Sequence, residues 1–134
     1  MSYFLVILLS ITITSGAFEK FPDAIHGTIA DVTKKCISEN NLSTEMLPHQ
    51  EIKFIDIMKN EGLQKVYMCG MIASGFGDET GHVKVEKIAQ FFPQHVQKVI
   101  EECNKVDGKD PIATATKFLA CIEEKSPVLY SLTL

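Results

Sequence analysis

Four cysteines, Cys36, Cys69, Cys103 and Cys121, constrain this chain more than any other feature of its sequence. The closest two are 18 positions apart, whereas a structural zinc site needs pairs of cysteines only about two to four residues apart. A metal centre is therefore not expected. An even number of cysteines in a small chain is typical of disulfides when the protein reaches an oxidising compartment. Four cysteines allow three pairings, and their number alone does not choose among them.

The first seventeen residues, Met1–Ala17, are typical of a signal peptide. Their apolar core, Phe4–Leu9, is far too short to span a bilayer. Ser15 and Ala17 occupy the small-residue positions that precede a cleavage site, so we expect cleavage before Phe18, although no Lys or Arg precedes the apolar core. The predicted product is a secreted, extracellular domain of residues 18–134, in which disulfides form and persist.

The expected mature chain has the size of one compact domain with a single hydrophobic core. It contains no second apolar stretch long enough for a membrane helix. Its 13 basic residues, all lysine, are outnumbered by 17 acidic ones, which gives a net charge of -4. Nucleic acid is therefore not expected as a partner, because binding to it depends on neutralising phosphates with basic side chains.

Apolar residues recur at helical spacing along most of the chain. In the first such segment Ile25, Ile29, Val32 and Cys36 share one face, which directs Cys36 inward. Helices are predicted over residues 23–39, from 43 or 44 to about 48, over 50–60, 63–74, 85–92 and 94–106, and from 110 to about 127. No segment shows a strand pattern. The fold class is predicted to be all-α, with six or seven short helices.

Glycine and proline mark the expected boundaries of these helices. Gly62 is expected to end or separate the third helix, and residues 75–81 read as a Gly-rich loop. Asp110 followed by Pro111 predicts the cap and first turn of the last helix. The segment 94–106 has the clearest amphipathic pattern, with Val106 as its last inward residue.

Helix positions suggest one of the three cysteine pairings. Cys103 ends one amphipathic helix and Cys121 lies near the end of the next, so antiparallel neighbours could be tied by this pair, which leaves Cys36 for Cys69. In the loop-closure model the two rings, of 19 and 34 residues, would each stabilise the fold by about 3 to 4 kcal/mol. That is comparable with the whole net stability of a small domain.

The cysteine spacing resembles that of the insect odorant-binding proteins, whose usual pattern has six cysteines, the second and third separated by three residues and the fifth and sixth by eight. Lys65 lies four residues before Cys69, and Ile112 lies nine before Cys121, so they occupy the places of the second and fifth cysteines. The run Asp110-Pro111-Ile112-Ala113-Thr114-Ala115 resembles the family's Asp-Pro-Cys-x-x-Ala segment. Because the second and fifth cysteines pair with each other in this family, their joint loss leaves Cys36–Cys69 and Cys103–Cys121 and is typical of the "minus-C" subgroup. The interval between Cys69 and Cys103 is slightly short for the family.

The resemblance implies helices around an internal hydrophobic cavity that carries a small hydrophobic ligand, such as an odorant or pheromone, through aqueous fluid. The resemblance implies no cofactor and no catalysis. It is compatible with a membrane chemoreceptor as a second partner and with a monomer or weak homodimer. The candidate ligand-binding residues are Phe54, Ile55, Met58, Met71, Phe76, Val83, Ile88, Phe91, Phe92, Val96, Val99, Phe118, Ile122 and Tyr130. Each of these is equally consistent with ordinary core packing.

Three further interpretations concern the properties of this cavity. Relatives place small hydroxylic residues on the helix that carries Cys69, where this chain has Met71 and, past it, Phe76, so the resemblance implies a dry cavity that prefers long apolar ligands over small alcohols. Tyr67, Ser74 and Tyr130 are the candidate polar anchors, since apolar pockets use a few hydrogen-bonding groups for orientation. Residues 128–134 are too apolar to be left in water and are predicted to form a lid.

An enzyme is not expected, because the chain lacks a Gly-x-Ser-x-Gly elbow and all of its cysteines are committed to disulfides. The rival reading is a protein of the same fold with another role, either a carrier or scavenger of lipids or hormones in haemolymph, reproductive fluid or saliva, or a protein-interaction module. The sequence does not separate these roles. Asn41-Leu42-Ser43 is a glycosylation sequon in an expected loop, and its occupancy is left open by the sequence.

Overall fold

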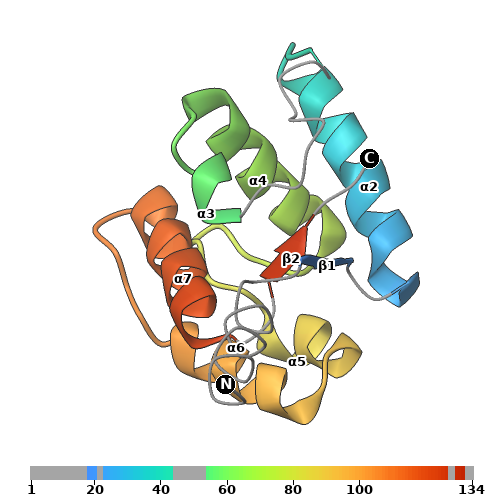
Figure 1. Cartoon of the computed structure of the whole chain (residues 1–134). Helices are drawn as coiled ribbons and strands as arrows, with labels where there is room; N and C mark the ends of the chain where they lie inside the picture. The colour runs from blue at the N-terminus through green and yellow to red at the C-terminus, as the bar shows by residue number, and fades with distance from the viewer. Residues whose placement is uncertain (1–17, 21–22, 44–53, 127–128, 132–134) are drawn as a thin grey trace, which may run out of the picture.

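A computed structural model of the chain describes residues 18–20, 23–43, 54–126 and 129–131 (Figure 1). These ranges form β1 (Phe18–Lys20), α2 (Asp23–Glu39), α3 (Phe54–Ile57), α4 (Glu61–Ser74), α5 (Val85–Ile88), the 3₁₀-helix η2 (Ala89–Phe91), α6 (Gln94–Cys103), α7 (Pro111–Lys125) and β2 (Leu129–Ser131). The predicted all-α class is confirmed. None of the described helices is long and apolar enough to cross a membrane. The expected signal peptide and the expected helix near residue 44 lie outside the described residues.

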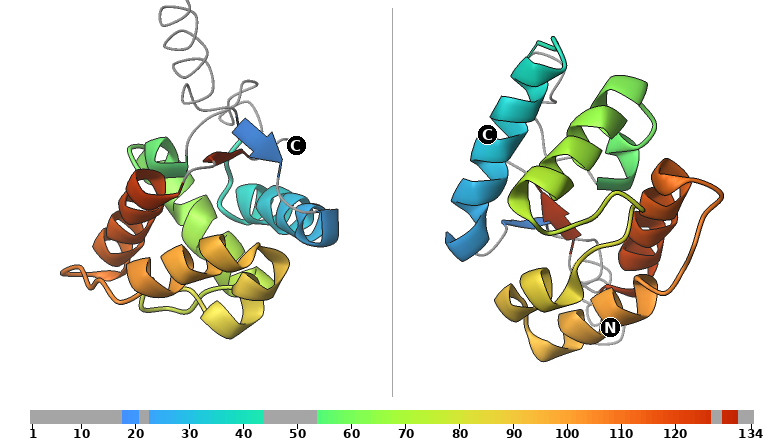
Figure 2. Two further views of the ribbon diagram at one scale, coloured as in Figure 1. Left: turned by 60° about the horizontal axis from the view of Figure 1, so that its bottom comes forward. Right: turned by 180° about the vertical axis from the view of Figure 1, so that it is seen from behind.

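Two disulfides tie two pairs of neighbouring helices. Helices α2 and α4 lie side by side (Figures 1 and 2), and Cys36 and Cys69 join them with an S–S distance of 2.04 Å. Cys103 and Cys121 join α6 to α7 with an S–S distance of 2.03 Å. This is the pairing that helix positions suggested and the family resemblance implied. The short helix α3 contacts both α4 and α7, so it connects the two stapled pairs.

Helix α4 begins at a polar cap, and its first turn contains Gly62. The side-chain oxygen of Asn60 accepts a hydrogen bond from the backbone N–H of Leu63 at 3.1 Å, which satisfies one of the free donors of the first turn. The prediction that Gly62 ends or separates a helix is therefore wrong, because the asparagine cap already fixes the boundary. The other end agrees with prediction: Gly75 has a φ of 79° and caps α4 in the left-handed conformation.

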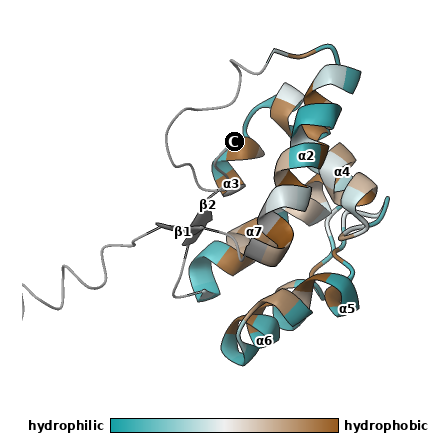
Figure 3. Cartoon of the chain, turned by 90° about the vertical axis from the view of Figure 1, so that its right-hand side faces the viewer, coloured by the Kyte–Doolittle hydropathy of each residue, from teal (hydrophilic) through white to brown (hydrophobic). Residues whose placement is uncertain are grey.

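The segment between Gly81 and Lys105 forms the lower part of the molecule in Figure 1. The predicted helix over 85–92 is divided into α5 and η2, and α6 follows directly after Pro93. Helix α6 is amphipathic, with its polar and apolar residues on different faces, as the sequence pattern predicted (Figure 3). Helix α6 ends at Cys103, so the expectation that Val106 is its last inward residue is wrong; Val106 is 38 % exposed.

Helix α7 starts where the sequence predicted. The carboxylate of Asp110 accepts a hydrogen bond from the backbone N–H of Ala113 at 2.7 Å, and Pro111 follows as the first helical residue. The hydroxyl of Thr114 accepts a further hydrogen bond from the backbone N–H of Gly108 at 2.9 Å. These contacts fix the turn between α6 and α7, and with it the position of Cys121 opposite Cys103.

Two short strands join the ends of the described chain. β1 and β2 pair in parallel, with Phe18 opposite Leu129 and Lys20 opposite Ser131. The sequence analysis predicted no strand, and this expectation is wrong for these two segments. The pairing joins residues more than 100 positions apart, so no local sequence pattern predicts it. It places part of the apolar tail next to the first residues of the expected mature chain.

Candidate functional site

One continuous cluster of apolar side chains, here called the central cluster, receives residues from every described helix. Its buried members are Ile25, Met58, Phe76, Val83, Phe92, Val96, Ile100, Cys103, Ala115, Phe118 and Leu119. Half-buried members pack around them: Ile29, Ile55, Tyr67, Met68, Met71, Val85, Ile88, Phe91, Val99, Ile112, Cys121 and Ile122. The rings of Phe76 and Phe91 meet edge to face with centroids 6.2 Å apart, a favourable aromatic geometry.

The structure brings the predicted ligand-binding residues together in this cluster. Every one of them whose side chain is described belongs to it. The side chains of Phe54 and Tyr130 lie outside the described part of the structure, although the backbone of both is placed in α3 and β2. Membership of the cluster shows that a residue packs with the core. It does not by itself show that the residue contacts a ligand.

Several members of the central cluster are not among the predicted ligand-binding residues. Ile25 and Ile29 reach it from α2, and Ile100 and Leu119 reach it from α6 and α7. Helical periodicity places Ile25 and Ile29 on the inward face of the first helix. It identifies a buried face without telling which other helix that face meets.

Tyr67 is the described residue that best fits a polar anchor. Its ring packs against the central cluster from α4, and its hydroxyl has no hydrogen-bond partner within the described residues. Burial raises the pKa of the Tyr67 phenol well above its usual range, which keeps the hydroxyl protonated and able to donate. The protonated Tyr67 phenol can therefore donate a hydrogen bond.

Ser74 is less suited to this role because its hydroxyl is already used in the turn that ends α4. It donates to the carbonyl oxygen of Met71 at 3.1 Å and accepts from the backbone N–H of Phe76 at 3.3 Å. These local bonds are typical of serine at a helix end. The same bonds hold the Ser74 hydroxyl in a structural role, which agrees with the absence of a nucleophile elbow in the sequence.

The loop after α4 is bridged within itself and is held against the rest of the molecule at two points. Gly77 and Val83 form an antiparallel bridge. The side chain of Asn104 holds the backbone of Val83 from both sides, accepting from its N–H and donating to its carbonyl oxygen, each at 2.9 Å. The backbone of Gly81, with a φ of 90°, passes so close to Pro111 that a Cβ atom there would lie 2.2 Å from the Pro111 carbonyl oxygen. These contacts hold Phe76 and Val83 in the central cluster.

A polar group on the surface of the same loop connects it to the turn between α6 and α7. Nε2 of His82 lies 2.7 Å from a carboxylate oxygen of Asp107, and its Nδ1 lies 2.9 Å from the hydroxyl of Thr80. Thr80 also contacts Asp78 through a short hydrogen bond, which lowers the pKa of the Asp78 carboxyl. His82 therefore contributes a surface contact between two loops and does not enter the central cluster.

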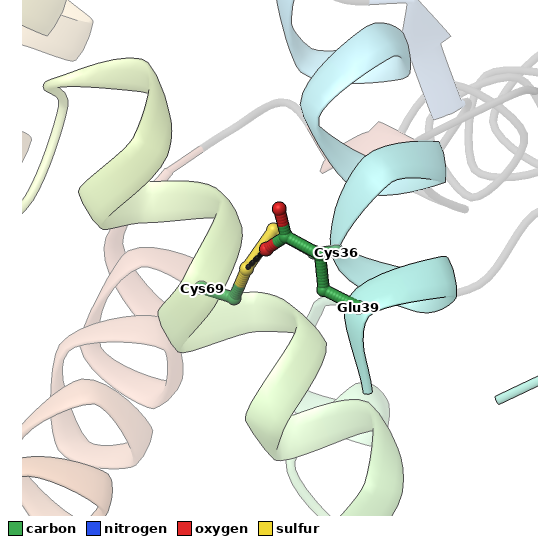
Figure 4. A group of neighbouring side chains, drawn as sticks. All are labelled: Cys36, Glu39 and Cys69. Atoms are coloured by element: carbon green, nitrogen blue, oxygen red, sulfur yellow. Dashed lines mark hydrogen bonds between the residues drawn. A yellow bond between two sulfur atoms is a disulfide. The ribbon is translucent and has the colours of Figure 1, made fainter. Parts of the chain in front are cut away.

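A second, smaller group, here called the side cluster, lies between α2 and α4. It consists of Cys36, Ile37 and Val66, with Leu42 and Cys69 packed against them. Glu39 lies beside the disulfide (Figure 4), with a carboxylate oxygen 3.9 Å from the sulfur of Cys69. Both sulfurs are bonded to each other, so this group offers a cation a single carboxylate and has the character of a covalent staple.

The chain matches one known protein family along most of its length. The sequence profile of the PBP/GOBP family, the insect odorant-binding proteins, matches residues 19–125. This chain belongs to the PBP/GOBP family. Among curated protein sequences, none matches it significantly. PBP/GOBP proteins are small binding proteins that carry hydrophobic ligands, and the family is not an enzymatic one.

The four cysteines of this PBP/GOBP protein are consistent with the minus-C subgroup. Both disulfides of the two remaining pairs are present, and no cysteine is free within the described residues. Lys65, in the place of the second cysteine of the family, is exposed on α4. Ile112, in the place of the fifth, packs against the central cluster from the first turn of α7. Ile112 therefore contributes an apolar side chain to the half-buried part of the central cluster.

Proposed function

We propose that this protein is a secreted carrier that holds a small hydrophobic molecule among the side chains of the central cluster and transports it through aqueous fluid. The observation that carries the proposal is the cluster of buried and half-buried apolar side chains to which every described helix contributes, in a chain that the PBP/GOBP family profile matches over residues 19–125. Residues 1–17 are removed on secretion under this proposal, and the predicted ligand-binding residues supply the contacts.

The chemistry of the central cluster favours a long apolar ligand that carries one hydrogen-bond acceptor. Met58, Met68 and Met71 provide flexible thioethers that adapt to ligands of varied shape. Tyr67 packs against this cluster and its phenol has no partner within the described residues, so it is the proposed anchor for an aldehyde, ketone or ester oxygen.

A displacement panel with an apolar fluorescent probe tests this function. The secreted protein should take up the probe, and long-chain aldehydes and esters should displace it at lower concentrations than short alcohols do. Equal displacement by all classes would contradict the proposed ligand preference. Failure to take up any apolar probe would favour the reading of the fold as a protein-interaction module. Tissue of expression separates an olfactory carrier from one that acts in haemolymph, reproductive fluid or saliva.

The substitution Tyr67→Phe tests whether the Tyr67 hydroxyl anchors the ligand. The substitution removes a hydroxyl that has no described partner, so the stability of the free protein should be unchanged or slightly higher. Affinity for a long-chain aldehyde or ester should fall by about twofold to tenfold, which corresponds to one hydrogen bond of about 0.5–1.5 kcal/mol. Affinity for an alkane of the same length should not change.

Ser74→Ala is the matched control for this measurement, because its hydroxyl bonds only to neighbouring backbone atoms in the described structure. It should leave the ratio of ester to alkane affinity unchanged. An unchanged ratio in Tyr67→Phe as well would remove Tyr67 from the site.

The C-terminal tail is proposed to act as a lid over the ligand. Deleting residues 128–134 removes β2, which pairs with β1, and should increase the rate at which bound ligand dissociates. Deleting only residues 132–134 keeps the paired strand and should have a smaller effect. Stopped-flow release of a fluorescent ligand measures both rates, and equal rates in the two deletions and the intact protein would rule out the lid.

A further inference from the structure

The sequon Asn41-Leu42-Ser43 lies at the turn that ends α2. The backbone N–H of Asn41 donates to the carbonyl oxygen of Ser38 at 3.1 Å, and the N–H of Leu42 donates to that of Ile37 at 3.0 Å. Asn41 has a φ of 57°, the left-handed conformation that ends many helices. Asparagine tolerates this conformation better than other residues with a side chain, apart from aspartate. The position of the sequon is therefore fixed by the end of the helix.

The acceptor side chain is available in the folded protein. Asn41 and Ser43 are exposed, and the Asn41 amide makes no hydrogen bond within the described part of the chain. The adjacent Asn40 differs, because its side-chain amide donates to the carbonyl oxygen of Cys36 at 2.7 Å. Between the two exposed sequon residues, Leu42 turns toward the protein and packs against the side cluster. The backbone is thus anchored while the Asn41 side chain faces solvent.

The sequon is also remote from the proposed ligand site. Leu42 belongs to the side cluster between α2 and α4, whereas the central cluster is formed without it. In Figures 1 and 2 the end of α2 that carries the sequon lies at the opposite end of the molecule from α5 and α6. A bulky group at Asn41 would therefore extend into solvent and leave the ligand site accessible.

We propose that Asn41 carries an N-linked glycan, added as the chain enters the secretory pathway. The inference rests on the secretion that the proposed function includes. In this reaction the amide nitrogen of Asn41 forms a bond to the anomeric carbon of a lipid-linked oligosaccharide diphosphate. The bond from that carbon to the diphosphate oxygen breaks, the lipid diphosphate leaves, and the amide loses one proton. The glycan adds a hydrophilic group to the surface beside the side cluster.

The test is the intact mass of the full-length chain expressed with its own leader in insect cells. The secreted protein should have the mass of residues 18–134 plus one N-glycan, and digestion with a glycoamidase should remove the addition and leave an aspartate at position 41. Asn41→Asp keeps the left-handed backbone and should abolish the addition, as should Ser43→Ala. Asn40→Asp, next to the sequon but outside it, should leave the addition in place.

Three outcomes would overturn the proposal, and they are distinguishable. Secreted protein without a glycan would refute glycosylation at Asn41 and leave the proposed secretion intact. Intracellular protein that retains Met1–Ala17 would contradict secretion and glycosylation together. A glycan that persists in both Asn41→Asp and Ser43→Ala would refute Asn41 as its site.

Discussion

Replacing Cys36 and Cys69 together by alanine should lower the free energy of unfolding by about 4 kcal/mol in the loop-closure model. The bond closes a ring of 34 residues, since its partners are 33 positions apart. Cys36 is fully buried in the side cluster, so its loss also leaves a small cavity. For a domain of this size the melting temperature should fall by on the order of 15 °C. Thermal unfolding followed by circular dichroism measures this.

The second disulfide provides the matched comparison for that result. Cys103 and Cys121 are only 18 positions apart, so their joint replacement by alanine should cost about 3 kcal/mol. Because the minus-C framework has no third disulfide, the loss of either bond should lower the melting temperature measurably. Removal of Cys36–Cys69 with no change in melting temperature would show that the packing of α2 on α4 is sufficient without the staple.

Gly81→Ala should be strongly destabilising, with an expected cost of about 3 kcal/mol or more. Two effects combine at this position. A side chain at a φ of 90° is strained by about 1–2 kcal/mol, and its Cβ would lie 2.2 Å from the carbonyl oxygen of Pro111, where overpacking costs typically about 1–3 kcal/mol. The loop must then move away from α7, which also withdraws Val83 from the central cluster and should weaken ligand binding.

Gly75→Ala separates backbone strain from the steric clash. Gly75 also has a positive φ, of 79°, but a Cβ there would meet nothing within 4 Å. Its substitution should therefore cost only the backbone strain, about 1–2 kcal/mol. Chemical denaturation of both variants gives the comparison. Equal costs for Gly75→Ala and Gly81→Ala would mean that the loop is not docked on Pro111.

Local features of the sequence predicted most of the helices. The 3.6-residue periodicity located α2, α4 and α6, and the pair Asp110-Pro111 located the start of α7 to the residue. The boundary near Gly62 was misplaced because the stronger signal is the side-chain cap supplied by Asn60. Val106 continues the apolar spacing of α6 beyond the end of the helix, where that spacing no longer determines a face.

Features that depend on contacts between distant residues were not predictable in the same way. The pairing of β1 with β2 and the two hydrogen bonds between Asn104 and Val83 both join segments with no shared local pattern. The candidate ligand-binding residues whose side chains are described lie in one cluster because inward faces converge in a small domain with a single core. Periodicity could not rank them, since core packing and ligand contact require the same apolar side chains.

The central claim, that the molecule accommodates a hydrophobic ligand in its interior, is most directly tested by titrating the secreted protein with one apolar fluorescent dye. We expect saturable uptake of one dye molecule per chain, with emission shifted to the blue and reversed by a long-chain ester. The same protein, reduced and unfolded, should show no saturable uptake. Uptake that fails to saturate, or that is equal in the folded and unfolded protein, would contradict an interior binding site.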